Sequence, residues 1–211
     1  MNKSYQILEV RAAEGGARLL VEIEERVGEA RQKEVLSLLC ARLTRLPQRG
    51  GISLEEVEEL RREAAICAAI GAGLRALGAS GSSRRHLIEK LRVRGYSHDV
   101  AAAAVEELAE KGYLKEEEGA LREAEKGLAK LWGDRRILAD LQAKGYTAGA
   151  LKYAEARLRT EDGAARCAQL IRKRRLCLSG EEAEVRRSVA ALMRYGYTMQ
   201  EIRSAQKYTK K

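Results

Sequence analysis

An internal repeat constrains the fold of this chain more than any other feature of its sequence. A glycine-tyrosine pair followed by serine or threonine occurs three times, at intervals of 50 and 51 residues. The flanking residues align without gaps: arginine stands ten positions before each glycine, leucine four before it and alanine nine after it. The copies are Gly95-Tyr96-Ser97, Gly145-Tyr146-Thr147 and Gly196-Tyr197-Thr198. Three copies of one supersecondary unit are therefore predicted.

Each triplet has the chemistry of a tight turn between two helices. A glycine after an amphipathic helix provides the left-handed C-terminal cap that other residues resist, so we expect a positive φ there. The Ser or Thr two positions later is a good N-cap for a second helix, and the tyrosine is expected to pack between the two helices. A third helix is predicted before each pair, over residues 53–77, 115–131 and 160–175. Ser53 and Glu56 form a capping box at the start of the first of them.

These observations predict a mainly α fold. It contains three tandem three-helix, helix-turn-helix-like repeats at 51–112, 113–158 and 159–211, and we expect them to form an elongated curved array. The composition agrees, because 34% of residues are charged, only one is proline and none is phenylalanine. Such an array suits a long partner better than a small substrate.

Residues 1–50 are predicted to form a small β-hairpin plus a helix. Apolar and polar residues alternate over 5–11 and 18–24, which is typical of two strands, and Glu14-Gly15-Gly16 joins them. After the second predicted strand, the spacing of apolar residues changes to that of a helix, and this helix is predicted to end at Pro47. The stripe on this predicted helix is Val35, Leu38, Leu39, Leu43 and Leu46.

The positive charge is concentrated near the C-terminus. The chain carries +9, with 40 basic and 31 acidic residues. Residues from Arg159 onward hold 13 basic and 6 acidic side chains, or +7, and the preceding 158 residues hold only +2. A basic tail on a nearly neutral body indicates an anionic partner, either nucleic acid or an acidic protein groove. The alternative is a solvated surface that keeps the protein soluble.

Three arginine pairs occupy equivalent positions near the start of the first helix of each turn motif, and a basic run precedes the last pair. On a repetitive array such charges could follow phosphates or a repeating acidic surface. The alternative is that they pair with nearby glutamates, or cover the apolar stripe with their aliphatic stems. The predicted partner-binding residues are Arg84, Arg85, Arg135, Arg136, Arg172, Lys173, Arg174, Arg175, Arg186 and Arg187.

No catalytic or metal site is predicted. His86 and His98 are the only histidines, and they offer no Ser-His-Asp arrangement. Gly71-Ala72-Gly73 lies inside a predicted helix, which favours helix packing over dinucleotide binding. The cysteines lack the two-residue spacing of a zinc site, so reduced structural thiols are expected at Cys40, Cys67, Cys167 and Cys177. We expect no enzyme activity, no cofactor and no metal.

The remaining class predictions concern the compartment. No run of 18 apolar residues is present, so we expect no membrane span. The first residues lack the apolar region of a signal peptide. A cytoplasmic protein with reduced thiols is therefore expected.

From about residue 50 onward the chain resembles a known family. The stretches that carry the resemblance are Ser83-Arg84-Arg85-His86-Leu87, Leu91 to Tyr96 with Ala104 and Leu108, Lys111-Gly112-Tyr113-Leu114, Arg135-Arg136-Ile137 with Leu141, Lys144 and Gly145, and Leu192 to Thr198 with Ile202. In order and spacing they resemble the RecX family, the regulators of the bacterial recombinase RecA. Lys115-Glu116 departs from the family, where an aspartate pair commonly follows the Gly-Tyr-Leu turn.

The resemblance implies a function that periodicity alone does not. It implies a monomer that binds RecA and the RecA filament on single-stranded DNA, with weak direct DNA binding as a further expectation and no membrane partner. Such binding would modulate, and mostly inhibit, ATP turnover, strand exchange and the SOS co-protease activity. The rival is a tandem helix-turn-helix nucleic-acid-binding protein. Against it, the second helices are rich in alanine, as in 101–104, and poor in residues that read base edges.

Overall fold

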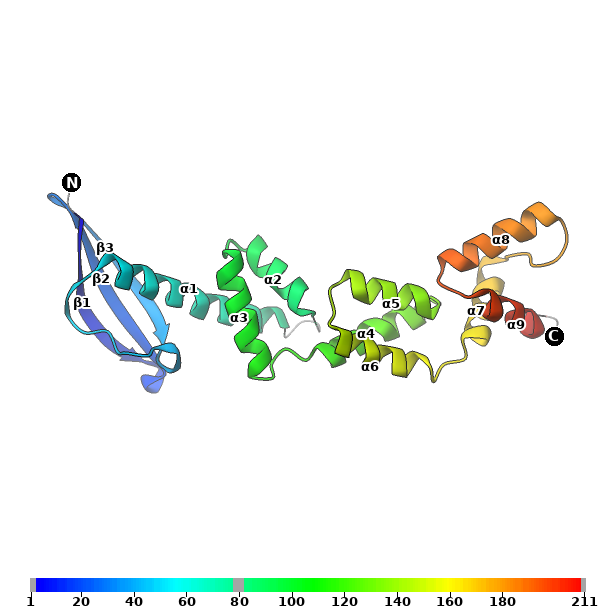
Figure 1. Cartoon of the computed structure of the whole chain (residues 1–211), viewed down its shortest axis with the longest axis horizontal. Coiled ribbons are helices and arrows are strands. Elements are labelled where there is room, and N and C mark those ends of the chain that lie inside the picture. Colours follow the sequence, from blue (N-terminus) through cyan, green and yellow to red (C-terminus); the bar gives the residue numbers. More distant parts are fainter. Residues whose placement is uncertain (1–2, 78–81, 210–211) are drawn as a thin grey trace. The chain divides into compact units, whose positions relative to one another are not determined.

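The computed structural model describes residues 3–77 and 82–209 (Figure 1). The chain folds into two compact units: one holds the described residues up to Ala76 together with Ile88–Tyr113, and the other holds the described residues between Leu77 and Leu87 together with those from Leu114 onward. The strands are β1 (Lys3–Ala13), β2 (Arg18–Val27), β3 (Ala30–Leu39) and β4 (Gly50–Ile52). The helices are α1 (Leu54–Leu77), α2 (Arg84–Val93), α3 (His98–Glu110), α4 (Glu116–Ala129), α5 (Asp134–Ala143), α6 (Ala148–Leu158), α7 (Gly163–Arg174), α8 (Glu182–Arg194) and α9 (Met199–Thr209).

The predicted class, helices behind a small N-terminal β segment, is confirmed. Residues 51–112, 113–158 and 159–211 each enclose three of the described helices, namely α1–α3, α4–α6 and α7–α9. The boundaries of the repeats as domains, and their stacking into a curved array, stay predictions.

The N-terminal strands form one antiparallel sheet in the order β3-β2-β1-β4, with α1 across one face (Figure 1). Alternate residues of β1 and β2 point to this face, as the period of two in the sequence predicts. The buried core is Tyr5, Ile7, Val21, Ile23, Leu38 and Val57. Ser53 and Glu56 form the predicted capping box at the start of α1: the Ser53 amide donates to the Glu56 carboxylate at 2.8 Å, and the Glu56 amide donates to the Ser53 hydroxyl at 3.2 Å.

The helix predicted in the second half of residues 1–50 is wrong. Residues Ala30–Leu39 form β3, which pairs with the whole of β2, and a short 3-10 turn follows over Cys40–Arg42. Leu36 and Leu38 face the core with a period of two, whereas Val35 is exposed. The helix-like spacing in this segment arises only because several apolar residues are adjacent. The segment forms a strand because β2 offers an unpaired edge with which it can pair. The predicted hairpin is therefore part of a four-stranded sheet.

The three repeat turns have the predicted geometry. Gly95, Gly145 and Gly196 have φ values of +94°, +76° and +94°. In the last turn the Tyr197 amide donates to the Leu192 carbonyl at 3.2 Å and the Gly196 amide to the Met193 carbonyl at 2.9 Å. The other two turns repeat this pair of bonds, which defines the Schellman motif and satisfies carbonyls at the helix end. The repeated leucine is thus the residue whose carbonyl closes the turn.

The N-cap residues of all three triplets and the tyrosines of the last two also act as predicted. The hydroxyls of Ser97 and Thr147 accept hydrogen bonds from amides three residues later, and Thr198 forms a full capping box with Glu201. Tyr197 is almost fully buried among residues of α7, α8 and α9, and Tyr146 lies in the equivalent core of α4, α5 and α6. Each repeat of the second unit therefore has a small apolar core centred on its turn tyrosine.

Turns also pack against the helix starts of the preceding repeat. The Gly133 amide, just before α5, donates to the Tyr195 carbonyl at 2.7 Å, and the Ser83 hydroxyl, just before α2, donates to the Lys144 carbonyl at 2.5 Å. A Cβ atom on Gly133 would clash with the backbone of Gly196. Backbone meets backbone where Gly133 and Gly196 approach each other, so both glycines are sterically required there, whereas a Cβ on Gly145 would meet the Arg85 side chain.

The turn glycines should differ in their tolerance of a side chain. A Cβ on Gly95 meets nothing within 4 Å, one on Gly145 lies 2.6 Å from Arg85 Cδ, and one on Gly196 lies 2.5 Å from the Arg136 backbone nitrogen. We expect Gly95→Ala to lower the free energy of unfolding by about 1 kcal/mol, because only the left-handed backbone is strained. Gly145→Ala should cost more, and Gly196→Ala should cost about 1–3 kcal/mol beyond Gly95→Ala because backbone must move. Urea unfolding of the three variants measures this order, and equal losses would contradict it.

Candidate partner-binding surface

Cations of the first unit are largely paired with carboxylates. Arg42 bridges Glu63 at 2.7 Å and Glu107, and Arg61 bonds to Glu34 at 2.5 Å and to Glu58 at 2.7 Å. Burial alone would raise the pKa of Glu107, but hydrogen bonds from Lys111 and Arg42 hold this pKa below its ordinary value. These pairs stabilise contacts between elements of the first unit, and the charges inside them are neutralised.

The predicted partner-binding residues have a different environment. Arg84 pairs with Glu116, whose carboxylate also accepts the Arg84 amide at 2.8 Å, and Arg186 pairs with Glu182. Glu116 thereby caps the start of α2, while Lys115 at the N-cap of α4 makes no side-chain cap bond. The rest have no carboxylate within 4.0 Å anywhere in the described part of the chain. They are Arg85, Arg135, Arg136, Arg172, Lys173, Arg174, Arg175 and Arg187.

The basic run 172–175 ends α7 with four exposed side chains. Positive charge at this end complements the helix dipole. Arg172 Nη1 donates to the Tyr208 carbonyl at 3.3 Å. Arg175 is the left-handed cap of α7, with a φ of +52°, a conformation that glycine adopts more easily. The run is thus a solvent-facing cluster, and the prediction that it binds a partner is untested.

Two of the predicted arginines meet at an aromatic cluster that the sequence did not predict. Arg136 of α5 lies 4.3 Å from the ring of Trp132 and 5.3 Å from the ring of Tyr195. Lys130 lies 4.9 Å from the same Trp132 ring, and Arg174 of α7 lies 5.9 Å from the Tyr195 ring. Cations and rings therefore alternate in the order Lys130, Trp132, Arg136, Tyr195, Arg174, which we call the cation–ring ladder.

Several contacts fix the elements that carry the ladder. Arg166 of α7 is buried and pairs with Asp134 at the start of α5. The Tyr197 hydroxyl donates to the Leu131 carbonyl at 3.0 Å, next to Trp132. Arg136 Nη1 donates to the Arg194 carbonyl at 3.5 Å, next to Tyr195. The ladder is thus held by the same junction of α5, α7 and the α8–α9 turn that the glycines define.

Trp132 and Tyr195 were not selected by sequence analysis, and the sequence contains only a weak indication of their role. Trp132 is the only tryptophan of the chain, and it stands a few residues before the second arginine pair. Tyr195 precedes the turn glycine, where the other repeats have Arg94 and Lys144. Because the repeat does not preserve either aromatic residue, alignment of the copies could not select them.

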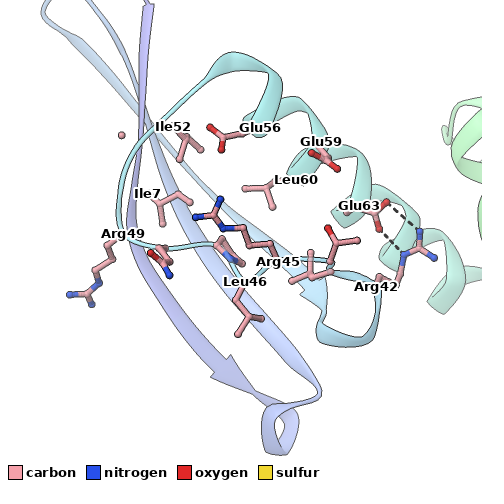
Figure 2. Close-up of a pocket in the computed structure, with 15 residues that line it drawn as sticks. Ile7, Arg42, Arg45, Leu46, Arg49, Ile52, Glu56, Glu59, Leu60 and Glu63 are labelled. Carbon is pink, nitrogen blue, oxygen red and sulfur yellow. Dashed lines mark hydrogen bonds and ion pairs between the residues drawn. The ribbon is translucent and has the colours of Figure 1, made fainter.

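A cavity of about 490 Å³ lies in the first unit, between β1, the loop after the 3-10 turn and α1 (Figure 2). Its walls mix apolar side chains such as Ile7 and Leu60 with charges of both signs, and Arg45 extends into it between β1 and α1. Arg42 and Glu63 at one end are already bonded to each other. The charges at this end of the cavity are thus already satisfied by each other, and sequence reasoning placed no site in the cavity.

The cysteines do not form a reactive or metal-binding group. Burial raises the pKa of the Cys67 thiol, and it raises that of Cys167 to about 12. Within residues 3–77 and 82–209, no group of three or more His, Cys, Asp or Glu side chains could hold a metal ion. No helix in these same ranges has the length and hydropathy needed to cross a membrane.

Comparison with known proteins identifies the fold. A crystal structure of regulatory protein RecX superposes with a TM-score of 0.70 at 13% identity, covering 96% of this chain and 99% of that one. The chain has the RecX fold. RecX from Lactobacillus salivarius superposes with a TM-score of 0.56 at 17% identity, covering 68% of this chain and 96% of that one. No protein-family model and no curated protein matches the sequence.

The RecX resemblance seen in the sequence is thereby confirmed at the level of the fold. The described helices and strands of this chain belong to an architecture that superposes on one solved RecX structure over nearly its whole length. At this sequence identity the comparison transfers the backbone arrangement, whereas the binding residues must be argued from this chain.

The thiols of this RecX-fold protein should react in an order set by burial. At pH 8 a thiol with a pKa near 12 holds on the order of one thiolate in ten thousand molecules, so Cys167 and the buried Cys67 should alkylate only on unfolding. Cys40 is half-buried and should react first, and Cys177 should follow because a hydrogen bond to Glu184 raises its pKa. Mass spectrometry of peptides after timed iodoacetamide treatment reports the order. Early modification of Cys167 would contradict the buried packing of α7.

Arg175→Gly should stabilise the second unit although it removes a predicted binding residue. Glycine relieves the left-handed strain at the end of α7, and we expect the free energy of unfolding to rise by about 1 kcal/mol. Leu131, which has a φ of +57° at the end of α4, is the matched comparison. Leu131→Gly should not stabilise, because the Leu131 side chain packs on the core of the third repeat. Urea unfolding of both variants tests this, and a loss of stability in Arg175→Gly would show that its side chain is needed for the fold.

Proposed function

We propose that this protein is a RecX-type regulator that binds RecA and its filament on single-stranded DNA. In this role it modulates, and mostly inhibits, the ATPase, strand exchange and SOS co-protease activities of RecA. The observation that carries the proposal is the RecX fold over 96% of the chain. Independent support comes from the Gly-Tyr-Ser/Thr turns and the arginine positions of the sequence, which resemble the same family. The protein would act in the cytoplasm, as a monomer and without a cofactor.

The distribution of charge supports an anionic partner. In the second unit the exposed cations of α5, α7 and α8 include many with no carboxylate partner, whereas Arg42 and Arg61 of the first unit are each bonded to several. Unpaired charges produce a field that reaches solvent and attracts an oppositely charged surface. A regulator needs only such a binding surface, because ATP turnover and strand exchange are reactions of the recombinase itself.

The alternative of sequence-specific DNA reading by the repeats is less well supported. The second helix of the first repeat, α3, exposes Asp99, Glu106 and Glu110. These carboxylates would face phosphates if α3 entered a groove, and such contacts are repulsive. The buried side of α3 consists of Val100, Ala101, Ala104, Val105 and Leu108, and is occupied by packing.

The direct test is the DNA-dependent ATPase of RecA titrated with this protein. We expect turnover to fall at near-stoichiometric or lower ratios, with filaments shortened in electron micrographs. The triple variant Arg172→Glu, Arg174→Glu, Arg175→Glu should bind filaments at least about tenfold more weakly, equivalent to about 1.4 kcal/mol. Its affinity should also depend less on salt, because fewer ion contacts remain to be screened. Filament co-sedimentation at two salt concentrations gives both quantities.

The matched control changes the net charge equally at other exposed helix positions. Arg62, Arg122 and Lys152 lie on α1, α4 and α6 and are exposed. Their replacement by Glu should leave filament affinity within about threefold of wild type, since helix propensities of Arg, Lys and Glu are similar. Circular dichroism checks folding of both triple variants. Unchanged ATPase at saturating wild-type protein would refute the function, and equal losses in both variants would refute the assignment to α7.

A further inference from the structure

We propose that the cation–ring ladder is a binding site for the phosphate backbone of single-stranded nucleic acid. The ladder consists of Lys130, Trp132, Arg136, Tyr195 and Arg174. The inference deepens the proposed function, and it rests on that function for the choice of a single strand over a duplex. It assigns direct nucleic-acid contact to named residues at the junction of the second and third repeats.

The first argument is that the rings hold the cations in place. Arg136 lies between Trp132 at 4.3 Å and Tyr195 at 5.3 Å, and its Nη1 donates to the Arg194 carbonyl at 3.5 Å. Cation–π contacts of this kind attract a guanidinium without neutralising its charge. The guanidinium is thereby ordered before a ligand arrives, which lowers the entropy lost on binding.

The second argument is that no carboxylate competes for these charges. In the described part of the chain Lys130, Arg136 and Arg174 have no carboxylate within 4.0 Å. Arg174 is exposed, and Trp132 and Tyr195 are half-buried. Arg135 and Arg172, Lys173 and Arg175 add exposed positive charge on the same two helices. A row of ordered cations without counter-charge is the expected surface for a polyanion.

The third argument concerns the kind of anion. Trp132 has two cations within 5 Å of its ring centroid and Tyr195 has two within 6 Å, so a base that stacks on either ring competes with these cations. The ligand must therefore be read through its charges. A guanidinium is a flat fork of donors that matches phosphate oxygens, and a phosphodiester chain offers one charge per nucleotide along a line. A row of three cations fits such a chain, and the site should show little base preference.

The wild-type experiment uses the only tryptophan of the chain as a reporter at the site. The full-length protein is titrated with oligodeoxythymidylate of about 20 nucleotides, and with oligodeoxyadenylate of the same length, in about 50 mM salt. We expect a saturable change in Trp132 emission with both, at similar midpoints. An unchanged emission at saturating oligonucleotide, with binding seen by anisotropy of a labelled oligonucleotide, would place binding elsewhere and overturn the proposal.

Two matched variants test the residues. Arg136→Gln with Arg174→Gln removes two ladder cations, and the control variant, Arg122→Gln with Lys152→Gln, removes two exposed cations from α4 and α6 of the same unit. By anisotropy, the ladder variant should bind at least tenfold more weakly. The slope of log affinity against log salt should become shallower by about 1.4, because each phosphate contact on a single strand contributes about 0.7. The control variant should stay within about threefold of wild type in affinity, and equal weakening in both variants would overturn the proposal.

Further arms distinguish the ligand and the fold. Arg174→Gln alone keeps the test valid if the double variant fails to fold, because this exposed side chain makes no hydrogen bond to the described residues, and it should weaken binding at least threefold. Sodium tripolyphosphate and poly-glutamate should compete only at tenfold or higher charge concentrations than the oligonucleotide. Equal competition by poly-glutamate would indicate a carboxylate-binding site, and equal competition by tripolyphosphate a small phosphate site, and either result overturns the proposal. The oligonucleotide-binding assays contain no RecA. Their outcome is therefore independent of the RecA ATPase assay, and failure of this proposal can be distinguished from failure of the proposed function.

Discussion

The close approach of backbones at the turn glycines is the constraint on which the second unit depends. Gly196 reverses the chain with a positive φ, and the same residue lies against Gly133 and the backbone of Arg136. Gly196 thus ends α8 and also allows the α8–α9 turn to pack against the start of α5. Because backbone meets backbone there, the relative position of α5 and the α8–α9 turn is set by steric contact rather than by adjustable side chains. The cation–ring ladder is held on this junction because that contact fixes the elements that carry its side chains.

Local signals account for the part of the fold that the sequence predicted. Glycine at a left-handed position, Ser or Thr at an N-cap and the Thr198–Glu201 box act within one or two helical turns, so their pattern is visible in a short stretch of sequence. Residues 30–39 could not be predicted in the same way. Their apolar spacing fits either period, and only the free edge of β2, a long-range feature, favours a strand. The four-stranded sheet was for this reason expected as a hairpin and a helix.

The candidate site shows the same division between local and distant information. Arg136 and Arg174 were predicted from repetition and charge density, but their meeting around Tyr195 joins residues from three helices and a turn. Trp132 and Tyr195 have no counterpart in the other repeats. A repeat alignment finds what all copies need for folding, and it hides what one junction alone possesses. Residues that break the repeat are therefore the better guide to binding in a modular protein.

The contrast between the two units shows where folding needs charge and where it does not. Arg42 joins Glu63 and Glu107 across three elements, so its removal would leave partly buried carboxylates without a partner. Arg174 and Arg175 contact no carboxylate in the described part of the chain, and Arg175 even occupies a left-handed position that glycine would fill with less strain. Arg175 thus combines a left-handed backbone with the absence of an ion pair in the described residues, which is consistent with the proposed binding role of this surface. The strain at the end of α7 and the ordering of Arg136 between two rings thus point to the same surface, by arguments that do not depend on one another.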